Sequence, residues 1–490
     1  MRENVGFADE TRVDTRHLQH LVARKPWLAD FAFLIRSDAD IEALLDAEHE
    51  AGQSGVDLLT ALFTVNRITP HRYTEALAAV LEIPAAGYDI SFDQNGPRGC
   101  FTQPGAVATP IFGYWRGTPA LIVCATDAFP RVVATRVASA RSGAPVVVLV
   151  AARPLQSAVE LACAAINVKA ATFGLKRSQP LFSAGRAGPQ WQPIIIAVGI
   201  GLVAGSATAN PQGTLAIFTL LLTVPFLGTV LVRLMALVGL LFRSPGLQPA
   251  APRIPDRELP IYSFMVALYD EADVLPTLIA ALTNLDYPAT KLDGLLVIED
   301  GDFATKAALL EIALPAFMRV VVVPDGELRT KPRALNYALA LARGVYVVIY
   351  DAEDRPEPDQ LRRALAAFRT AADTGSGTQQ LACVQACLNI YNARQSWLTR
   401  QFTVEYSALF DSVLPTLQRL RMPMPLGGTS NHFPRRVLAE LRGWDPYNVT
   451  EDADLGIRIA RLGHRVTMIS STTWEEAPAT FNLWLKQRTR

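Results

Sequence analysis

A long uncharged stretch in the middle of the chain is the feature that most restricts how this protein can fold. From Pro193 to Val232 there is no Asp, Glu, Lys or Arg in forty consecutive residues, a composition foreign to an ordinary protein surface. A polar break at 209–213 leaves two apolar segments, Pro193–Thr208 and Thr214–Phe242. The first is short for a membrane span, and the second is long enough with some tilt. The sequence therefore predicts a hairpin of two transmembrane helices.

The basic residues that flank the hairpin predict its orientation. Lys176, Arg177 and Arg186 precede it, and Arg243 and Arg253 follow it. Because basic residues concentrate on the cytoplasmic side of membrane proteins, we expect both large regions of the chain in the cytosol. A hairpin buried inside a soluble protein is the alternative.

Composition and length narrow the remaining possibilities. Lys plus Arg and Asp plus Glu are equal at 46 each, so no overall charge indicates a nucleic-acid polymer as partner. Five scattered cysteines fit a reducing compartment without a disulfide framework. The expected parts are an N-terminal extension (1–34), a small module (35–168), a linker (169–192), the hairpin (193–242), a second linker (243–259) and a larger C-terminal domain (260–490).

The region before the hairpin changes from a helical to an alternating pattern. Amphipathic helical stretches run from about Phe31 to Ala86, and strand-like and helix-like runs alternate from Thr109 onward. This order predicts a small α+β module. Its expected strand, helix, strand and helix are Ala120–Ala125, Pro130–Ala140, Pro145–Val150 and Leu155–Ala165.

The region after the hairpin predicts a larger sheet. Five apolar runs alternate with helical segments, and this order predicts an α/β fold with a doubly wound, mostly parallel sheet. The expected strands are Ile261–Leu268, Gly294–Ile298, Arg319–Val323, Val345–Tyr350 and Leu381–Leu388. Ligands of such sheets bind beyond the carboxyl ends of the strands, so the residues after each run are the first candidates for a site.

Acids follow three of these strands. The fourth strand ends in Asp351, Glu353 and Asp354, and acids also fill the segments 269–273 and 299–302 after the first two strands. Residues two apart on an extended chain face the same way, so Asp351 and Glu353 can approach one ligand, and a hard divalent cation would relieve their repulsion. An acidic start of the next segment is the alternative, but recurrence at one edge favours a site.

Two predicted helix starts complete the candidate set. Lys331 opens a helix after the third strand, where an exposed cation suits a phosphate group. Thr450, Glu451 and Asp452 open a later helix, and because acids are favoured in any first turn, a purely structural role is the alternative. The helix N-terminus predicts a low pKa for Asp452. The basic amphipathic segment from Trp484 to the end is typical of a helix at a membrane surface.

Together these motifs resemble those of processive membrane glycosyltransferases of family 2, the bacterial cellulose synthase and hyaluronan synthase group. The elements in common are an acidic pair after the second strand, Asp-x-acid after the fourth, Thr-Glu-Asp at a helix start and Gln-x-x-Arg near the end. The resemblance implies a nucleotide-diphospho-sugar transferase (GT-A-like) fold. It further implies an enzyme of the bacterial inner membrane that moves a sugar, with inversion, from a UDP-glucose-type donor to a growing β-linked polysaccharide.

The resemblance also implies roles for individual residues. Asp452 would be the general base, and Asp351 and Glu353 would hold Mg²⁺ or Mn²⁺. The residues implied to bind the UDP-sugar donor are Tyr269, Glu271, Glu299, Asp300, Lys331, Asp351, Gln487 and Arg490. Those implied on the side of the glycan acceptor are Gly428, Thr429, Ser430 and Glu451.

The sequence departs from the family pattern at several places. Glu353 stands where Asp is commoner, and the neighbouring Asp354 is an alternative metal ligand. Asp302 is an additional acid that the resemblance does not explain. Relatives continue past the final motif with a Trp and further membrane helices, whereas this sequence ends at Arg490, which puts polymer elongation by this C-terminally truncated domain in question.

The first module is similar to the N-terminal domain of type II secretion assembly ATPases. The similarity depends on the runs Leu121–Phe129 and Val146–Pro154. Some relatives of that domain bind cyclic di-GMP through motifs that open with Arg-Leu-Gly, and this chain has Ser54–Asp57 where the first would start. A docking or regulatory module with a protein partner is therefore favoured over a cyclic di-GMP site.

A function of a different class is a non-catalytic membrane adaptor, whose third domain would be a retired transferase that at most binds a donor. The complete set of candidate side chains argues against such decay. Substitution of Asp452 by Asn separates the two functions, because only an enzyme would lose activity.

Overall fold

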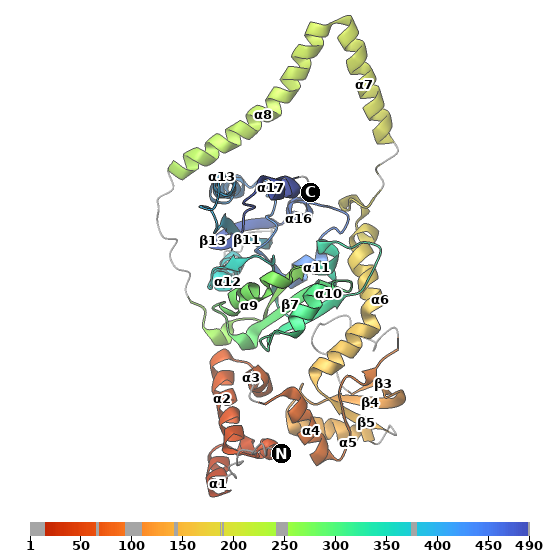
Figure 1. Cartoon of the computed structure of the whole chain (residues 1–490), viewed down its shortest axis with the longest axis vertical. Coiled ribbons are helices and arrows are strands. Elements are labelled where there is room, and N and C mark those ends of the chain that lie inside the picture. Colours follow the sequence, from red (N-terminus) through yellow and green to blue (C-terminus); the bar gives the residue numbers. More distant parts are fainter. Residues whose placement is uncertain are drawn as a thin grey trace, which may run out of the picture.

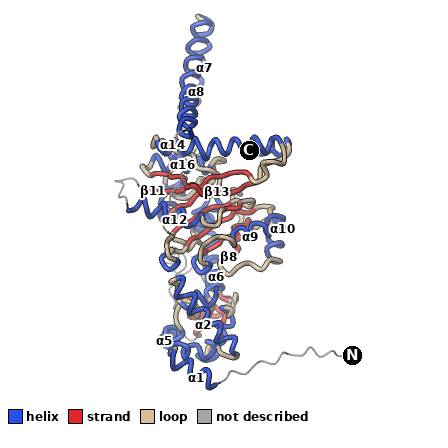
Figure 2. Tube along the Cα trace, turned by 90° about the vertical axis from the view of Figure 1, so that its left-hand side faces the viewer, coloured by secondary structure: helices blue, strands red, loops and turns tan. Residues whose placement is uncertain are grey.

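The computed structural model describes residues 15–64, 68–93, 110–141, 146–186, 188, 191–241, 253–373 and 380–488. An N-terminal module lies at one end of the molecule, and the larger C-terminal domain lies in the middle. A helical hairpin projects from the far side of that domain (Figure 1, Figure 2).

The N-terminal module joins a cluster of helices to a small sheet. The helical elements are α1 (Thr15–Arg24), the 3-10 helix η1 (Pro26–Leu34), α2 (Asp38–Ser54), α3 (Leu58–Thr64), α4 (Pro70–Leu81), α5 (Pro130–Arg141) and α6 (Ala152–Ser178). The sheet, of order β1-β5-β4-β3-β2, consists of β1 (Ala85–Ala86), β5 (Val147–Val150), β4 (Thr118–Cys124), β3 (Ile111–Trp115) and β2 (Ile90–Ser91). Leu28, Phe31 and Leu34 are buried in its core, so the packed module begins before residue 35.

Helix α6 is longer than its sequence pattern indicates. The pattern predicts a helix that ends near Ala165 and a linker from residue 169, but α6 continues to Ser178. Glu160 pairs with Arg319 of the C-terminal domain at 2.8 Å, and Ala171 of α6 is buried against that domain. This tertiary contact stabilises the second half of the helix, and a local pattern cannot reveal it.

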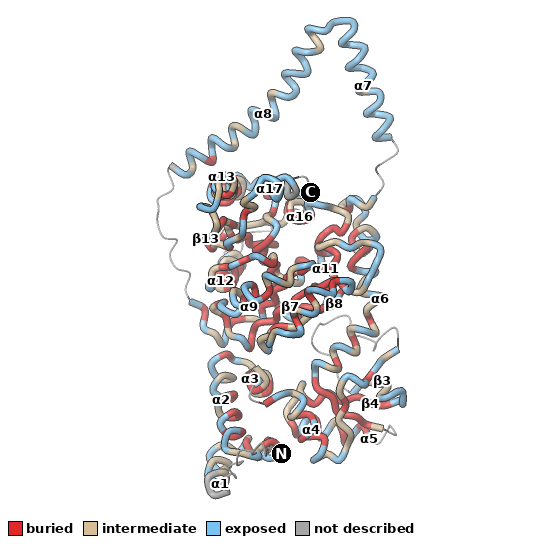
Figure 3. Tube along the Cα trace, viewed as in Figure 1, coloured by how far each residue is buried: buried red, intermediate tan, exposed pale blue. Residues whose placement is uncertain are grey.

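The two apolar segments of the sequence form α7 (Trp191–Ala209) and α8 (Pro211–Leu241). Both have the length and apolar composition of membrane-spanning helices, and nearly all of their described residues are exposed (Figure 3). Helix α6 meets the same criteria of length and hydropathy, but a third of its apolar window is buried within the protein. Exposed apolar surface of the extent seen on α7 and α8 fits a membrane.

The C-terminal domain is built on an eight-stranded sheet of order β10-β13-β11-β12-β9-β6-β7-β8. The strands are β6 (Tyr262–Leu268), β7 (Leu292–Glu299), β8 (Met318–Val323), β9 (Tyr346–Tyr350), β10 (Arg355–Pro356), β11 (Leu381–Ile390), β12 (Asn431–Pro434) and β13 (Arg465–Glu475). All five predicted strands are among them. Because β9, β6, β7 and β8 are parallel, the acid-bearing ends of β6, β7 and β9 meet at one edge.

The sheet is mostly parallel, as predicted, but it also contains two short strands, β10 and β12, that run against the other six. β12 runs antiparallel to both of its neighbours, β9 and β11, and β10 runs antiparallel to β13. β12 is short, begins with Asn431 and ends in Pro434, so it lacks the apolar run that marks the other strands. Its insertion brings the preceding loop to the end of β9, where the Ser430 N–H donates to the Ile349 carbonyl at 2.8 Å.

Helices cover both faces of this sheet. They are α9 (Leu275–Thr283), α10 (Phe303–Leu310), α11 (Lys331–Leu339), α12 (Gln360–Asp373), α13 (Trp397–Ser407), α14 (Leu414–Arg419), α15 (Arg435–Glu440), α16 (Glu451–Arg461) and α17 (Phe481–Arg488). Met265 and Leu295 pack in one core with α11, α15 and α16, whereas Phe264 and Leu296 pack with α9 and α12. Successive strand residues thus alternate between two apolar layers, as a doubly wound fold requires.

Candidate active site

The end of β9 supplies the central carboxylate of the site. Asp351 follows this strand, and its side chain is 37% exposed. Its N–H donates to Asp354 Oδ2 at 2.7 Å, and the Thr429 hydroxyl donates to the same oxygen. Asp354 is 1% exposed, and burial raises the pKa of its carboxyl well above the ordinary value. Asp354 therefore holds the turn together from inside, while Asp351 remains open at the edge of the sheet.

Lys331, the first residue of α11, lies between the acids of this edge. Its Nζ is 2.5 Å from Asp351 Oδ1, and it donates to the Gly428 carbonyl at 3.2 Å. Burial alone would lower the pKa of the lysine, but the carboxylates of Asp351 and Asp452 outweigh burial and raise the pKa above its usual value. The ammonium group is therefore charged at neutral pH, as a phosphate-binding group must be.

Asp452, in the first turn of α16, lies close to Lys331 and Asp351 and forms one cluster with them. It is 8% exposed, and a Cβ built on Gly428 would lie 3.8 Å from its Oδ2. Burial raises the pKa of Asp452 to about 8, even though the charge of Lys331 acts in the opposite direction. The low pKa predicted from the helix N-terminus is therefore wrong, because the loss of water around the carboxyl outweighs the helix dipole.

Glu353 and Glu271 lie close enough to Asp351 for their charges to interact. Burial, and then the charges of Asp351 and Glu271, raise the pKa of Glu353 to about 7. Burial also raises the pKa of Glu271, with Asp270 and Asp351 as the next causes. Repulsion of this kind is what a bound cation relieves.

The described residues include no group of three or more His, Cys, Asp or Glu side chains that could hold a metal by themselves. Mg²⁺ is nevertheless usually bound in proteins by one or two carboxylates together with substrate phosphates and water. Asp351 and Glu353 fit that mode of binding.

The acids after β7 divide into an inward and an outward group. Glu299 is buried and pairs with the buried Arg333 at 2.5 Å, so its carboxylate faces the interior. Asp300 is 58% exposed and pairs with Lys306 at 2.6 Å. Tyr269, after β6, is also exposed. Asp300 and Tyr269 are therefore accessible at this end of the sheet, as Asp351 is, whereas Glu299 is not.

Asp302, the additional acid, has a structural role. Its carboxylate accepts hydrogen bonds from the Asp270 N–H at 2.9 Å and from the Thr305 N–H at 3.1 Å. The second bond caps α10, and the first ties the turn after β6 to the turn after β7. These bonds outweigh the effect of burial and lower the pKa of Asp302.

The predicted acceptor residues differ in how they face the cluster. Gly428 contributes its carbonyl oxygen and lies beside Asp452. Thr429 and Ser430 are buried, and their hydroxyls bond to other side chains. Glu451 is nearly buried, and burial raises the pKa of its carboxyl. Thr429 and Ser430 therefore shape the loop from within, whereas Gly428 and Glu451 border the site.

Gln487 and Arg490 are the last of the predicted donor-binding residues. Gln487 belongs to α17, but its side chain and the whole of Arg490 lie outside the described residues.

Two residues of the cluster were not singled out by sequence. The fully buried Trp444 donates its indole N–H to Asp452 Oδ1 at 3.2 Å. Glu475 ends β13, and burial, then the charges of Asp351 and Glu353, raise its pKa to about 8. A carboxylate at a strand end would have indicated Glu475 if β13 had been recognised, whereas no pattern marks Trp444.

Known families and proteins resemble this chain over part of its length. Residues 260–490 match the family described as glycosyltransferase like family 2. The chain is similar to "Probable glycosyltransferase YdaM" of Bacillus subtilis, with 26% identity over 237 residues that cover 48% of this chain and 55% of that protein. It is also similar to the beta-monoglucosyldiacylglycerol synthase of Trichormus variabilis, with 25% identity over 268 residues (51% and 54%). The chain thus spans about half the length of the curated relatives it matches.

Among solved structures, the chain is similar to the mannosyltransferase PcManGT from Pyrobaculum calidifontis in complex with GDP-Man and Mn²⁺. The TM-score is 0.42 and the identity 23%, over 56% of this chain and 72% of that one. The family match covers the whole C-terminal domain, and within it Lys331, Asp351 and Asp452 come together at one edge of the sheet. Residues 260–490 are therefore a family 2 glycosyltransferase domain.

Proposed function

We propose that this protein is a membrane-bound inverting glycosyltransferase that moves a sugar from a UDP-glucose-type donor to a growing β-linked polysaccharide. The observation that carries the proposal is the meeting of Lys331, Asp351 and Asp452, from α11, β9 and α16. They are a phosphate-binding cation, a carboxylate able to bind a metal, and a buried base. This reaction requires all three.

The donor would lie across the ends of β6, β7 and β9. The exposed Asp300 and Tyr269 would contact the uridine, with Glu271 beside them. Lys331 would face the diphosphate at the start of α11. Glu299, whose carboxylate is buried in an ion pair, would shape this wall of the site without touching the nucleotide.

Asp351 and Glu353 would hold Mg²⁺ or Mn²⁺ at the diphosphate. Burial, and then the negative charges of Asp351 and Glu271, raise the pKa of Glu353, and a cation would relieve the repulsion between these charges. When bound, the cation stabilises the charge that develops on the leaving group.

Asp452 would act as the general base. Its carboxylate takes the proton of the acceptor hydroxyl while the hydroxyl oxygen attacks the anomeric carbon, and the bond from that carbon to the diphosphate oxygen breaks to release UDP. A single displacement of this kind inverts the configuration. With a pKa near 8, the ionised form is a stronger base than an ordinary aspartate. Gly428 and Glu451, next to Asp452, would border the acceptor.

The hairpin of α7 and α8 would anchor the enzyme in a bacterial inner membrane, with the module and the transferase domain in the cytosol. Helix α17 lies on the side of the domain that faces the hairpin (Figure 1). Its exposed Phe481, Leu483 and Leu485 would rest on the membrane surface. Gln487 and Arg490 would then close over the donor diphosphate.

The N-terminal module would serve as a docking or regulatory domain, as its similarity to secretion ATPases suggests. Ser54 is buried, and a Cβ on Gly55 would lie 2.9 Å from the carbonyl of Arg257, just before the C-terminal domain. Gly55 and Asp57 are exposed, but the segment lacks the Arg-Leu-Gly opening of the cyclic di-GMP motif, so a protein partner is favoured over cyclic di-GMP here.

Transfer from labelled UDP-glucose, in membranes that contain the full chain, tests the proposal. We expect transfer that requires Mn²⁺ or Mg²⁺ and stops with EDTA. Asp452→Asn should reduce it by about 100-fold or more and leave UDP binding intact, because removal of a general base affects the chemical step. Asp359→Asn is the matched control, since Asp359 forms an exposed ion pair with Arg363 elsewhere in the domain.

Parallel assays with UDP-N-acetylglucosamine and UDP-galactose define the donor. Label recovered in a lipid fraction instead of a polymer would reassign the acceptor. If no donor is transferred or hydrolysed, and Asp452→Asn behaves like the parent, the alternative of a non-catalytic membrane adaptor is supported.

A further inference from the structure

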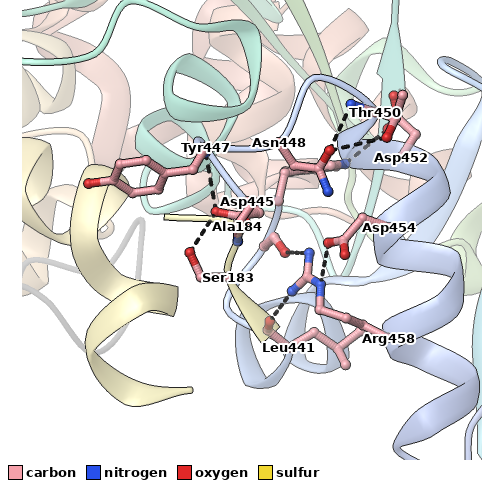
Figure 4. A network of polar contacts seen from close by, with 12 residues as sticks. Ser183, Ala184, Leu441, Asp445, Tyr447, Asn448, Thr450, Asp452, Asp454 and Arg458 are labelled. Atoms are coloured by element: carbon pink, nitrogen blue, oxygen red, sulfur yellow. Dashed lines mark hydrogen bonds and ion pairs between the residues drawn. The ribbon is translucent and has the colours of Figure 1, made fainter. Parts of the chain in front are cut away.

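Asp445, in the loop before α16, is held by the segment that leads from α6 toward the hairpin (Figure 4). Its buried carboxylate accepts hydrogen bonds from the Ser183 hydroxyl at 3.1 Å and from the Ala184 N–H at 2.6 Å. The Tyr447 N–H, from its own loop, donates at 3.2 Å. A buried carboxylate needs such donors, so Asp445 fixes the loop to the segment 183–184.

Aromatic contacts reinforce the same junction. A Cβ on Gly185 would lie 2.6 Å from the Tyr447 ring, so the two are in close contact. Lys176 Nζ lies 4.8 Å from the centroid of the Tyr447 ring, and the guanidinium of Arg461 lies 4.5 Å from the centroid of the Phe182 ring. The segment therefore contacts both the loop and the far end of α16.

The loop connects this junction to Asp452. Trp444, next to Asp445, donates its indole N–H to Asp452 Oδ1. Asn336 of α11 bonds to both backbone groups of Trp444, at 3.0 Å to its N–H and 2.8 Å to its carbonyl. The same amide donates to the Ala171 carbonyl of α6 at 3.3 Å. Helix α6 and the segment after it thus support Trp444 from two sides.

The loop and α16 are also tied to each other. The buried Arg458 donates to the Leu441 carbonyl at 3.0 Å, to the Gly443 carbonyl at 2.9 Å and to Asp454 at 2.8 Å (Figure 4). A displacement of the loop at Asp445 would therefore displace the start of α16 with it.

We infer that Ser183 and Asp445 are positioning residues, through which the segment leading into the hairpin holds Trp444 and the carboxyl of Asp452 in place. The inference rests on the proposed role of Asp452 as the base. It gives this segment a function beyond that of a linker, because a displaced base transfers protons poorly even when its chemistry is intact.

The test compares variants of the full chain with matched controls. The junction is disturbed by Ser183→Ala, Gly185→Ala and Asp445→Asn. The controls Ser178→Ala, Gly174→Ala and Asp359→Asn change the same residue types away from it, where the side chain is exposed or nothing lies nearby. Turnover of UDP-glucose is measured per UDP-binding site, so that loss of folded protein does not count as loss of rate.

We expect kcat to fall about three- to tenfold in the junction variants, with KM for UDP-glucose unchanged, because the base is displaced while the donor site is intact. The controls should stay within about twofold. Hydrogen exchange of residues 445–455 should be faster in Ser183→Ala than in Ser178→Ala.

The pH–rate profile of Trp444→Phe distinguishes a positioning role of Trp444 from a merely structural one. Loss of the indole N–H removes a hydrogen bond that favours the ionised form of Asp452, so the acid limb of the pH–rate profile should move to higher pH. The other titratable groups that act on Asp452, namely Lys331, Glu451 and Asp351, are unchanged in this variant. If Trp444→Phe lowers the number of UDP-binding sites but leaves the acid limb of the pH–rate profile where it is, Trp444 has a structural role only.

The two proposals fail in different ways. Full turnover in Asp452→Asn would remove the proposed base and the inference with it. Loss of turnover in Asp452→Asn, with parental kcat and parental hydrogen exchange in the junction variants, would overturn the inference alone.

Discussion

The proposed role of Asp452 as the base, together with its burial, predicts how the rate depends on pH. In the free protein its pKa is raised to about 8, so about one molecule in eleven carries the ionised base at pH 7 and about one in two at pH 8. Because kcat/KM reports the free enzyme, it should rise about fivefold between these values and level off near pH 9. An exposed aspartate, with a pKa near 4, would be ionised throughout and would give a flat profile.

The assay is the initial rate of UDP release from UDP-glucose, well below KM, from about pH 6 to pH 9.5. Glu475 also has a pKa of about 8 and could produce a limb in the same range, so Glu475→Gln is the control for assignment. The charges that raise or lower the pKa of Asp452 are those of Lys331, Glu451 and Asp351. The limb should therefore persist in Glu475→Gln and be lost in Asp452→Asn.

Two results would refute this reasoning. A flat profile in the parent protein would mean that the carboxyl of Asp452 keeps its water and an ordinary pKa. A limb that disappears in Glu475→Gln would assign the ionisation to Glu475 instead.

Three further predictions concern residues around the cluster. Arg333→Met leaves Glu299 buried without its partner and should destabilise the domain by about 3–5 kcal/mol. The thermal midpoint should fall more at pH 8 than at pH 5, because the Glu299 carboxyl can take up a proton at pH 5. An equal fall at both pH values would contradict this prediction. Gly456→Ala places a Cβ 2.2 Å from a backbone carbonyl and should lower the midpoint, whereas Gly174→Ala, with nothing nearby, should maintain or raise it. Asp351→Asn should raise the Mn²⁺ concentration for half-maximal transfer about tenfold or more, and an unchanged requirement would exclude Asp351 as a ligand.

The strands that carry the site could be predicted because they are buried on both faces. β9 is a continuous apolar run, and β6 is one apart from Ser263; a parallel pair in the middle of a sheet has this composition. β12 and β13 could not be predicted in the same way. β12 ends in a proline, and β13 contains the polar run Ser470–Thr473. The hydroxyls of Ser471 and Thr473 in this run are buried and bond inside the protein. Ser430, for example, bonds to Thr473 at 2.6 Å.

The sequence predicted which residues belong to the candidate site, but it did not predict their protonation states. Sequence indicated Lys331, Asp351 and Asp452 through their positions at a strand end and two helix starts. It could not indicate the pKa of Asp452, because burial depends on Trp444 and on a loop more than 20 residues away in the chain, at Gly428. Local rules about helix N-termini apply to exposed ends, and this one is covered.

The acids of this domain show why a count of carboxylates overestimates a binding site. Nothing in the sequence distinguishes Asp302, Asp354 and Asp445 from Asp300 and Asp351. Each of the first three, however, accepts a hydrogen bond from a backbone N–H within three residues of itself. A short acid that finds such donors can be buried and fix a turn. The turns fixed by Asp302 and Asp354 hold Asp300 and Asp351 at the open edge, and the turn fixed by Asp445 holds the loop behind Asp452. The acids proposed to bind ligands and the acids that fix turns therefore occur together, because the second kind places the first.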